Sequence, residues 1–264
     1  MKKYLETFRL SFKMQIIWRF DVAMTVLGTI CRILAAWLLW GAIFGERTDV
    51  SGFTFDSMLS YYVVSSFISS IDKSGDISGE VSQLIRDGGF SKHIAVPMDP
   101  LGFFGAMTAG QAAFHLGFGL ATAAVCTLLF NINIAFTADI MMITAAVAMV
   151  LMGIVFLICF QYMLGIISFI FLSVGGLNHF FGSVTAFATG AMIPLALLPE
   201  GVRAFLRLLP FYYANYLPAM LLTGRGADEM RAGLLVMSAW TAGMLFVARV
   251  SYNKMRVRYD GVGI

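Results

Sequence analysis

Arg32 is the residue whose chemistry is least expected of its surroundings, because it lies well inside the apolar stretch 22–44. An arginine at the centre of a membrane helix costs about 2.5–3.5 kcal/mol on insertion scales, so its side chain should face protein or water rather than lipid. We expect Arg32 to pair with a polar neighbour or a backbone carbonyl on another helix. The alternative is a direct place on a transport path.

A second group of polar side chains lies in the apolar segment 55–71 and recurs every four residues, which places it on one face of a helix. Its members are Tyr61, Tyr62, Ser65, Ser66, Ser69 and Ser70. Small hydroxylated residues let helices approach closely and hydrogen-bond to one another. Beyond simple packing, this face could be the wall of a pathway or an interface with another subunit, and we favour the interface.

Motifs for catalysis or nucleotide binding are missing from the sequence. It has neither a GxxxxGK[ST] phosphate loop nor an HExxH zinc motif, and its three histidines are scattered. The three cysteines lie inside apolar stretches without CxxC spacing, so we expect no disulfide or metal site. We therefore predict no catalytic residues, no bound cofactor and no nucleic-acid partner for this chain.

The composition indicates a membrane protein, because 59% of the 264 residues are hydrophobic and only 12% are charged. A helix needs about 20 residues to cross a bilayer. We predict an all-α integral membrane protein with a single domain (1–264) and six spans near residues 22–44, 55–71, 101–130, 140–171, 177–198 and 232–248. The parts of this domain are residues 1–20, 21–71, 72–100, 101–198, 199–231, 232–250 and 251–264.

The first 20 residues are predicted to form an amphipathic helix on the membrane lipid, with Leu5, Phe8, Phe12 and Ile16 on one face. With both termini in the cytoplasm, twelve Lys and Arg residues lie on the cytoplasmic side and five on the opposite side. Positive charge favours the cytoplasmic side. We therefore expect a multi-pass protein of the cytoplasmic (inner) membrane with both termini inside.

The segment 194–226 contains four prolines, which prevent one straight helix. Between the breaks, an apolar face lies opposite Arg203 and Arg207, which are four residues apart. We predict a short helix at the outer interface followed by a partly re-entrant segment. The expected aromatic anchors at this interface are Phe211, Tyr212, Tyr213 and Tyr216.

A short amphipathic helix is predicted in the cytoplasmic loop, with Asp76 as its cap and Gly88–Gly89 as its end. Its apolar face would carry Ile77, Val81, Leu84 and Ile85, and its polar face Glu80, Gln83, Arg86 and Asp87. Such a helix is suited to docking in the groove of another protein. The alternative is a helix that lies on the lipid surface.

The order of several segments resembles the six-span permease subunits of ABC-type-two transporters, specifically those similar to daunorubicin or viologen exporters. The segments are "FKMQIIWRFD" (12–21), "WLLWGAIFG" (37–45), "MLSYYVVSSFI" (58–68), "LIRDGGFSKHIAVPMDP" (84–100) and the proline-spaced stretch 190–224.

The resemblance implies a permease that pairs with a second, identical or homologous permease and with separate ABC ATPase subunits, which would bind ATP and magnesium. The loop helix would then be a coupling helix that receives the push of the ATPase through Ile77, Val81, Leu84, Ile85, Arg86 and Asp87. The substrate would be amphipathic, drug-like or lipid-like. Alternatives are an ion-coupled secondary transporter and a membrane scaffold without transport.

Overall fold

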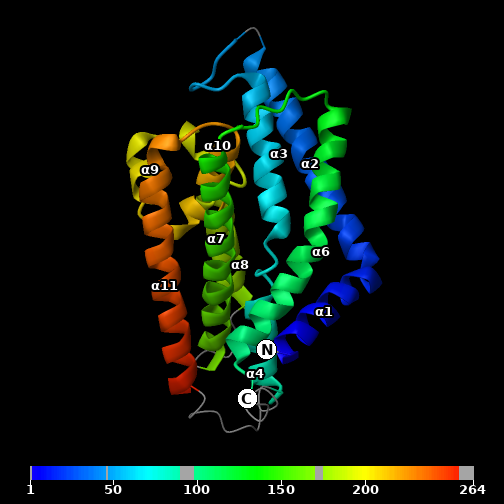
Figure 1. Cartoon of the computed structure of the whole chain (residues 1–264), viewed down its shortest axis with the longest axis vertical. Helices are drawn as coiled ribbons and strands as arrows, with labels where there is room; N and C mark the ends of the chain where they lie inside the picture. The colour runs from blue at the N-terminus through cyan, green and yellow to red at the C-terminus, as the bar shows by residue number, and fades with distance from the viewer. Residues whose placement is uncertain (1, 46, 90–97, 170–174, 256–264) are drawn as a thin grey trace.

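The computed structural model describes residues 2–45, 47–89, 98–169 and 175–255. The described residues are almost entirely helical and contain no strands, which confirms the predicted all-α class. Long helices run along the long axis of the molecule, with α4 at one end and α9 and α10 at the other (Figure 1). The start of α1 and the end of α11 lie at the same end as α4. The α-helices are α1 (Lys2–Ile17), α2 (Arg19–Phe44), α3 (Phe55–Ile71), α4 (Ile77–Arg86), α6 (Pro100–Leu129), α7 (Ile140–Ile166), α8 (Gly175–Ala188), α9 (Glu200–Leu206), α10 (Leu217–Leu222) and α11 (Met230–Met255).

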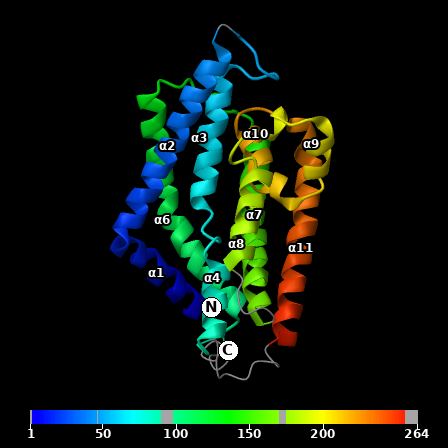
Figure 2. The ribbon, with the colours of Figure 1, turned by 180° about the vertical axis from the view of Figure 1, so that it is seen from behind.

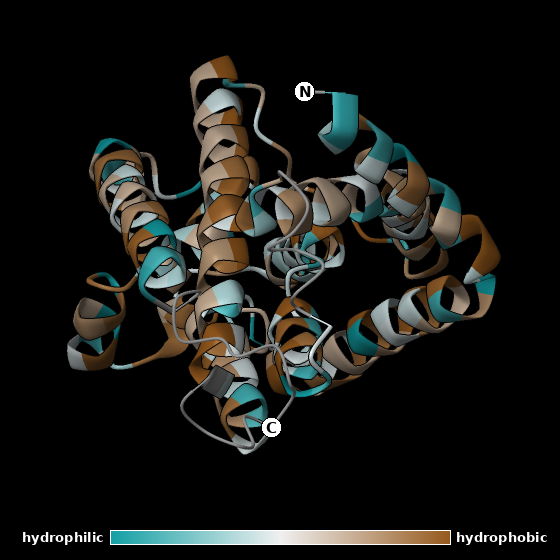
Figure 3. Cartoon of the chain, turned by 90° about the horizontal axis from the view of Figure 1, so that it is seen from below, coloured by the Kyte–Doolittle hydropathy of each residue, from teal (hydrophilic) through white to brown (hydrophobic). Residues whose placement is uncertain are grey.

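Four helical segments in the described part of the chain are long and apolar enough to cross a membrane: Arg19–Phe44, Pro100–Leu129, Ile140–Ile166 and Ala227–Lys254. Large apolar side chains such as Leu128 and Phe246 are exposed on them. Apolar residues predominate on these helices when the bundle is viewed from below (Figure 3). Helices that are apolar all round belong in lipid, so the chain is a multi-pass membrane protein.

The other two expected spans are shorter helices. The 17 residues of α3 extend about 26 Å, and the 14 residues of α8 extend about 21 Å, against a hydrocarbon core of roughly 30 Å. The fifth span was expected to continue to Leu198, but α8 ends at Ala188 and a turn follows at Gly190, whose φ of 72° favours glycine. The boundary between the fourth and fifth spans falls partly outside the described residues.

Local capping explains where several helices begin. The Asp99 side chain accepts a hydrogen bond from the Gly102 backbone N–H at the start of α6, with Pro100 in the first helical position. The Asp139 side chain caps α7 by accepting a hydrogen bond of 2.8 Å from the Met141 backbone N–H. Asp76 precedes α4 as expected, but its side chain makes no capping hydrogen bond.

The first helix packs along α6 near the end of the molecule that also holds α4 (Figure 2). The Asp99 backbone N–H donates to the Tyr4 hydroxyl over 3.2 Å, and the Gln15 amide oxygen lies 3.2 Å from a His115 ring nitrogen. At Gly110 of α6 a side chain would collide with the Phe8 carbonyl oxygen. Both ends of α1 are thus held against the first half of α6, and the two helices pack closely between these contacts.

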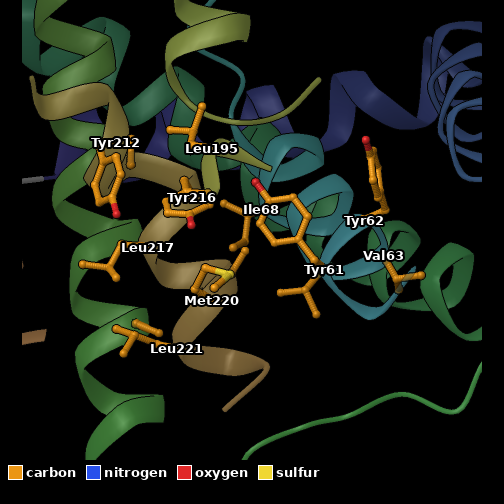
Figure 4. Packing of buried hydrophobic residues seen from close by; sticks show 14 of the residues in the cluster. Tyr61, Tyr62, Val63, Ile68, Leu195, Tyr212, Tyr216, Leu217, Met220 and Leu221 are labelled. Atoms are coloured by element: carbon orange, nitrogen blue, oxygen red, sulfur yellow. The ribbon is translucent and has the colours of Figure 1, made fainter. Parts of the chain in front are cut away.

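The main core lies where α3 meets α7 and the segment 211–222. Figure 4 shows Tyr61 and Ile68 of α3 pointing toward Tyr216 and Met220. The expected interfacial anchors Phe211, Tyr212, Tyr213 and Tyr216 are all buried in this core, so they are not anchors at the membrane surface. One reason is the close approach of this segment to α7. The Ala214 backbone lies directly against Gly153, which has no side chain to keep the two segments apart.

Charged side chains connect α9, the predicted outer helix, to the residues just before α11. Glu200 pairs with Arg203 and, over 3.0 Å, with Arg207. Arg207 also contacts Glu229 over 2.6 Å, and Glu229 accepts a hydrogen bond of 2.7 Å from the Tyr212 hydroxyl. The arginines predicted on the polar face of the outer helix therefore bind partners within the chain.

Candidate functional site

The loop helix α4 forms where the sequence predicts it, but its apolar face is already covered. Ile77, Val81 and Ile85 are 0–1% exposed and pack with residues of α6, α7 and α11, and Leu84 is half-buried beside them. The expectation that these four residues dock into a partner's groove does not fit this burial. A periodic apolar face indicates that the face is buried but not what buries it. Here α6, α7 and α11 of the same chain cover it.

A glycine of α7 sets how closely α4 approaches. A Cβ added to Gly165 would lie 2.6 Å from the Val81 Cβ and 3.1 Å from the Ser78 carbonyl oxygen. Carbon atoms at their best separation are about 3.5–4.0 Å apart. Only glycine therefore allows α4 to lie in its observed position on α7.

The opposite face of α4 is open. Glu80, Gln83, Arg86 and Asp87 are exposed and form no ion pair within the described part of the chain. Although Glu80 lies at the surface, the protein around it partly desolvates the carboxyl and raises its pKa, and the neighbouring Asp76 carboxylate raises it further. Of the six residues expected to meet an ATPase, Arg86 and Asp87 are the ones placed where a partner can reach them.

The hydroxylated face of α3 lies inside the chain. The Tyr61 hydroxyl donates to the Gly190 carbonyl oxygen over 2.7 Å, and the Tyr62 hydroxyl donates to the Met192 carbonyl oxygen over 3.0 Å. Ser65 and Ser66 are also buried. These four residues therefore pack against the chain's own helices. The favoured prediction, an interface with a second subunit, does not fit this burial.

Asn215 joins this face, although sequence reasoning did not single it out. Its Nδ2 donates to the Ser65 Oγ over 3.1 Å and to the Ser69 Oγ over 3.0 Å. Asn215 lies in the π-helical turn Tyr212–Tyr216, which continues into α10. The available signal was a single amide inside the aromatic run "YYANY", and that signal does not identify the distant serines.

Arg32, Ser69 and Asn215 line one cavity of about 270 Å³ between α2, α3, α7, α8 and the π-helical turn. Its other polar lining residues include Asp72, Gln161, Thr185 and Thr189. Arg32 is exposed and has no hydrogen bond or ion pair with any described residue, so the expected partner on another helix is not found. The structure thus brings Arg32 and Ser69 together in one cavity, whereas Tyr61, Tyr62, Ser65 and Ser66 do not line it.

No group of three or more His, Cys, Asp and Glu side chains that could hold a metal ion occurs among the described residues. The arrangement offers two features with functional meaning: a helix that presents charged groups at one end of the bundle, and a polar cavity between apolar helices. Neither resembles the acid, base and nucleophile set of an active site.

Comparison with known proteins agrees with this architecture. No curated protein matches the chain. The family model described as "ABC-2 family transporter protein" matches residues 30–263, which include the α3 face, α4, the cavity and the outer segment. Proteins of this kind are membrane components that are typically not catalytic themselves. The chain belongs to the ABC-2 family of transporter proteins.

Proposed function

We propose that the chain is the permease subunit of an ATP-driven exporter and that it works with separate ATPase subunits and a second permease subunit. Family membership implies ABC ATPase partners. The absent phosphate loop supports the same view, because the energy of ATP then has to come from another chain. The proposed substrate is amphipathic, drug-like or lipid-like, and the proposed location is the cytoplasmic membrane with both termini inside.

The observation that carries this proposal is the two-sided character of α4. One face packs against the long helices through Ile77, Val81 and Ile85, while the other leaves Glu80, Gln83, Arg86 and Asp87 exposed. A partner that pushes on the charged face moves α7 as well, because Gly165 leaves no space between the two helices. Closure of an ATPase dimer would in this way reach the helices that surround the cavity.

Co-purification tests the proposal. The tagged permease is co-expressed with an ATPase subunit that carries a GxxxxGK[ST] loop, and the complex is assayed for retained ATPase and ATP turnover. We expect both, and we expect the double variant Arg86→Glu with Asp87→Lys to reduce turnover while the permease still folds. Arg47→Glu, an exposed reversal of charge that lies outside α4, is the matched control.

An ion-coupled transporter would move its substrate without any ATPase, and a scaffold would retain the ATPase without substrate-dependent turnover. If the α4 double variant retains the ATPase and hydrolyses ATP as the wild type does, the charged face of α4 is not the coupling surface.

A further inference from the structure

The polar cavity adjoins an apolar groove, and the two share a wall. The groove has a volume of about 360 Å³ and is lined by apolar side chains of α3, α6 and α7, with Leu222 beside them. Ile68, Val150 and Ile154 line both the cavity and the groove. Ile68 is seen in Figure 4 beside Tyr61 of the core. A polar compartment and an apolar compartment are therefore separated by three side chains.

Two amide side chains in the cavity have unused acceptors. Asn215 is 4% exposed and Gln161 is 9% exposed, yet the Asn215 Oδ1 and the Gln161 Oε1 are buried without a hydrogen-bond partner among the described residues. The orientation of Asn215 is fixed, because its Nδ2 already donates to Ser65 and Ser69. Buried carbonyl oxygens of this kind require donors, and a bound molecule with hydroxyl groups would supply them.

Arg32 adds a positive charge to the same cavity. Its guanidinium carries five N–H donors and finds no acceptor among the described residues, although it lines the cavity. Asp72 also lines the cavity, and one of its carboxylate oxygens is occupied by the Ser74 backbone N–H at 3.0 Å. An anionic group on the bound molecule would give the guanidinium the charged acceptor that it favours.

We propose that this cavity binds the head group of an anionic lipid that carries hydroxyl groups, while the adjoining groove takes its hydrocarbon chain. The hydroxyls donate to Asn215 and Gln161, and the anionic group accepts from Arg32. The inference rests on the proposed function and specifies the substrate class of that exporter. It also accounts for Arg32, which lies within α2 and has no hydrogen-bond or ion-pair partner among the described residues.

Direct binding to the purified full-length chain in detergent tests this assignment. The probes are phosphatidylglycerol, phosphatidylcholine with the same acyl chains, and glycerol phosphate without chains. Phosphatidylglycerol has head-group hydroxyls and a net negative charge, phosphatidylcholine has neither, and glycerol phosphate lacks the apolar part. We expect phosphatidylglycerol to bind more tightly than either of the others.

Two variants and two matched controls locate the binding. Gln161→Met and Arg32→Met remove a cavity acceptor and the cavity cation, and each should weaken phosphatidylglycerol binding by roughly tenfold. Gln111→Met in α6 and Arg249→Met in α11 change the same residue types outside the cavity and should bind as the wild type does. The folded yield of each variant is measured alongside.

Three results would overturn the assignment: equal binding of the two phospholipids, unchanged binding in both cavity variants, or binding of glycerol phosphate as tight as that of the lipid. Because the binding assay contains no ATPase, its outcome is independent of co-purification. An intact, ATP-hydrolysing complex without lipid selectivity would refute the substrate class and leave the proposed function standing. Selective lipid binding by a permease that retains no ATPase would support the substrate class and refute the proposed function.

Discussion

Gly165→Ala should move α4 away from its position on α7. The new methyl carbon would lie 2.6 Å from the Val81 Cβ, 2.9 Å from its Cγ1 and 3.1 Å from the Ser78 carbonyl oxygen. Contacts between carbon atoms need about 3.5–4.0 Å, so α4 has to retreat by roughly an ångström. Two of the three atoms lie near the α4 backbone and cannot rotate away as the end of a flexible side chain would. Overpacking of this kind costs about 1–3 kcal/mol.

The assay is thermal unfolding of the purified permease, followed by ATP turnover of its complex. At about 2–4 °C per kcal/mol for a chain of this size, the midpoint should fall by several degrees, and turnover should fall with it. Gly243→Ala in α11 is the matched control, because an added Cβ there meets nothing within 4 Å. Alanine also favours helix over glycine, so the control should be neutral or slightly stabilised. If Gly165→Ala unfolds at the same temperature as the wild type, the close approach of α4 and α7 does not stabilise the fold.

Three further predictions concern other parts of the chain. In intact cells, Thr48→Cys should react with a membrane-impermeant thiol reagent and Gln83→Cys should not; the opposite pattern would reverse the proposed orientation. Glu229→Ala should destabilise the protein more than Glu200→Ala, because Glu229 is the less exposed carboxylate and also accepts from Tyr212, and equal melting temperatures would contradict this order. The pKa of Glu80 is raised in the folded protein, so the unfolded chain releases this proton first and stability should fall as the pH rises from about 4.3 through the raised value. Glu80→Gln should remove that part of the pH dependence in thermal unfolding, and an unchanged profile would show that Glu80 does not contribute.

Local patterns predicted many elements of the fold, because their signals lie within a few residues of one another. Asp99 with Pro100 marks the beginning of α6, and the segment between Asp76 and Gly88–Gly89 contains α4. The prolines after Leu198 break the outer segment into short helices. The all-helical class, the helix α4 and the polar character of α3 follow from such patterns.

Contacts between distant segments were not predictable in this way. The period of α4 indicates an apolar face but does not show that Gly165, far along the chain, receives it. The early end of α8 depends on a turn in which the Gly190 carbonyl accepts from Tyr61. Asn215 acquires its role from two serines that precede it by well over a hundred positions. The cavity is therefore a product of the tertiary structure, which brings residues of several distant segments to one place.

The attachment of α1 to α6 has a mechanical consequence. Two helices that are joined through Tyr4 at one end and Gln15 at the other, with a backbone contact at Gly110 between them, cannot slide or rotate independently. They form one stiff, angled unit, and its longer member, α6, is one of the helices long and apolar enough to cross a membrane. A displacement of α1 would therefore be passed on to α6, which carries part of the wall of the apolar groove.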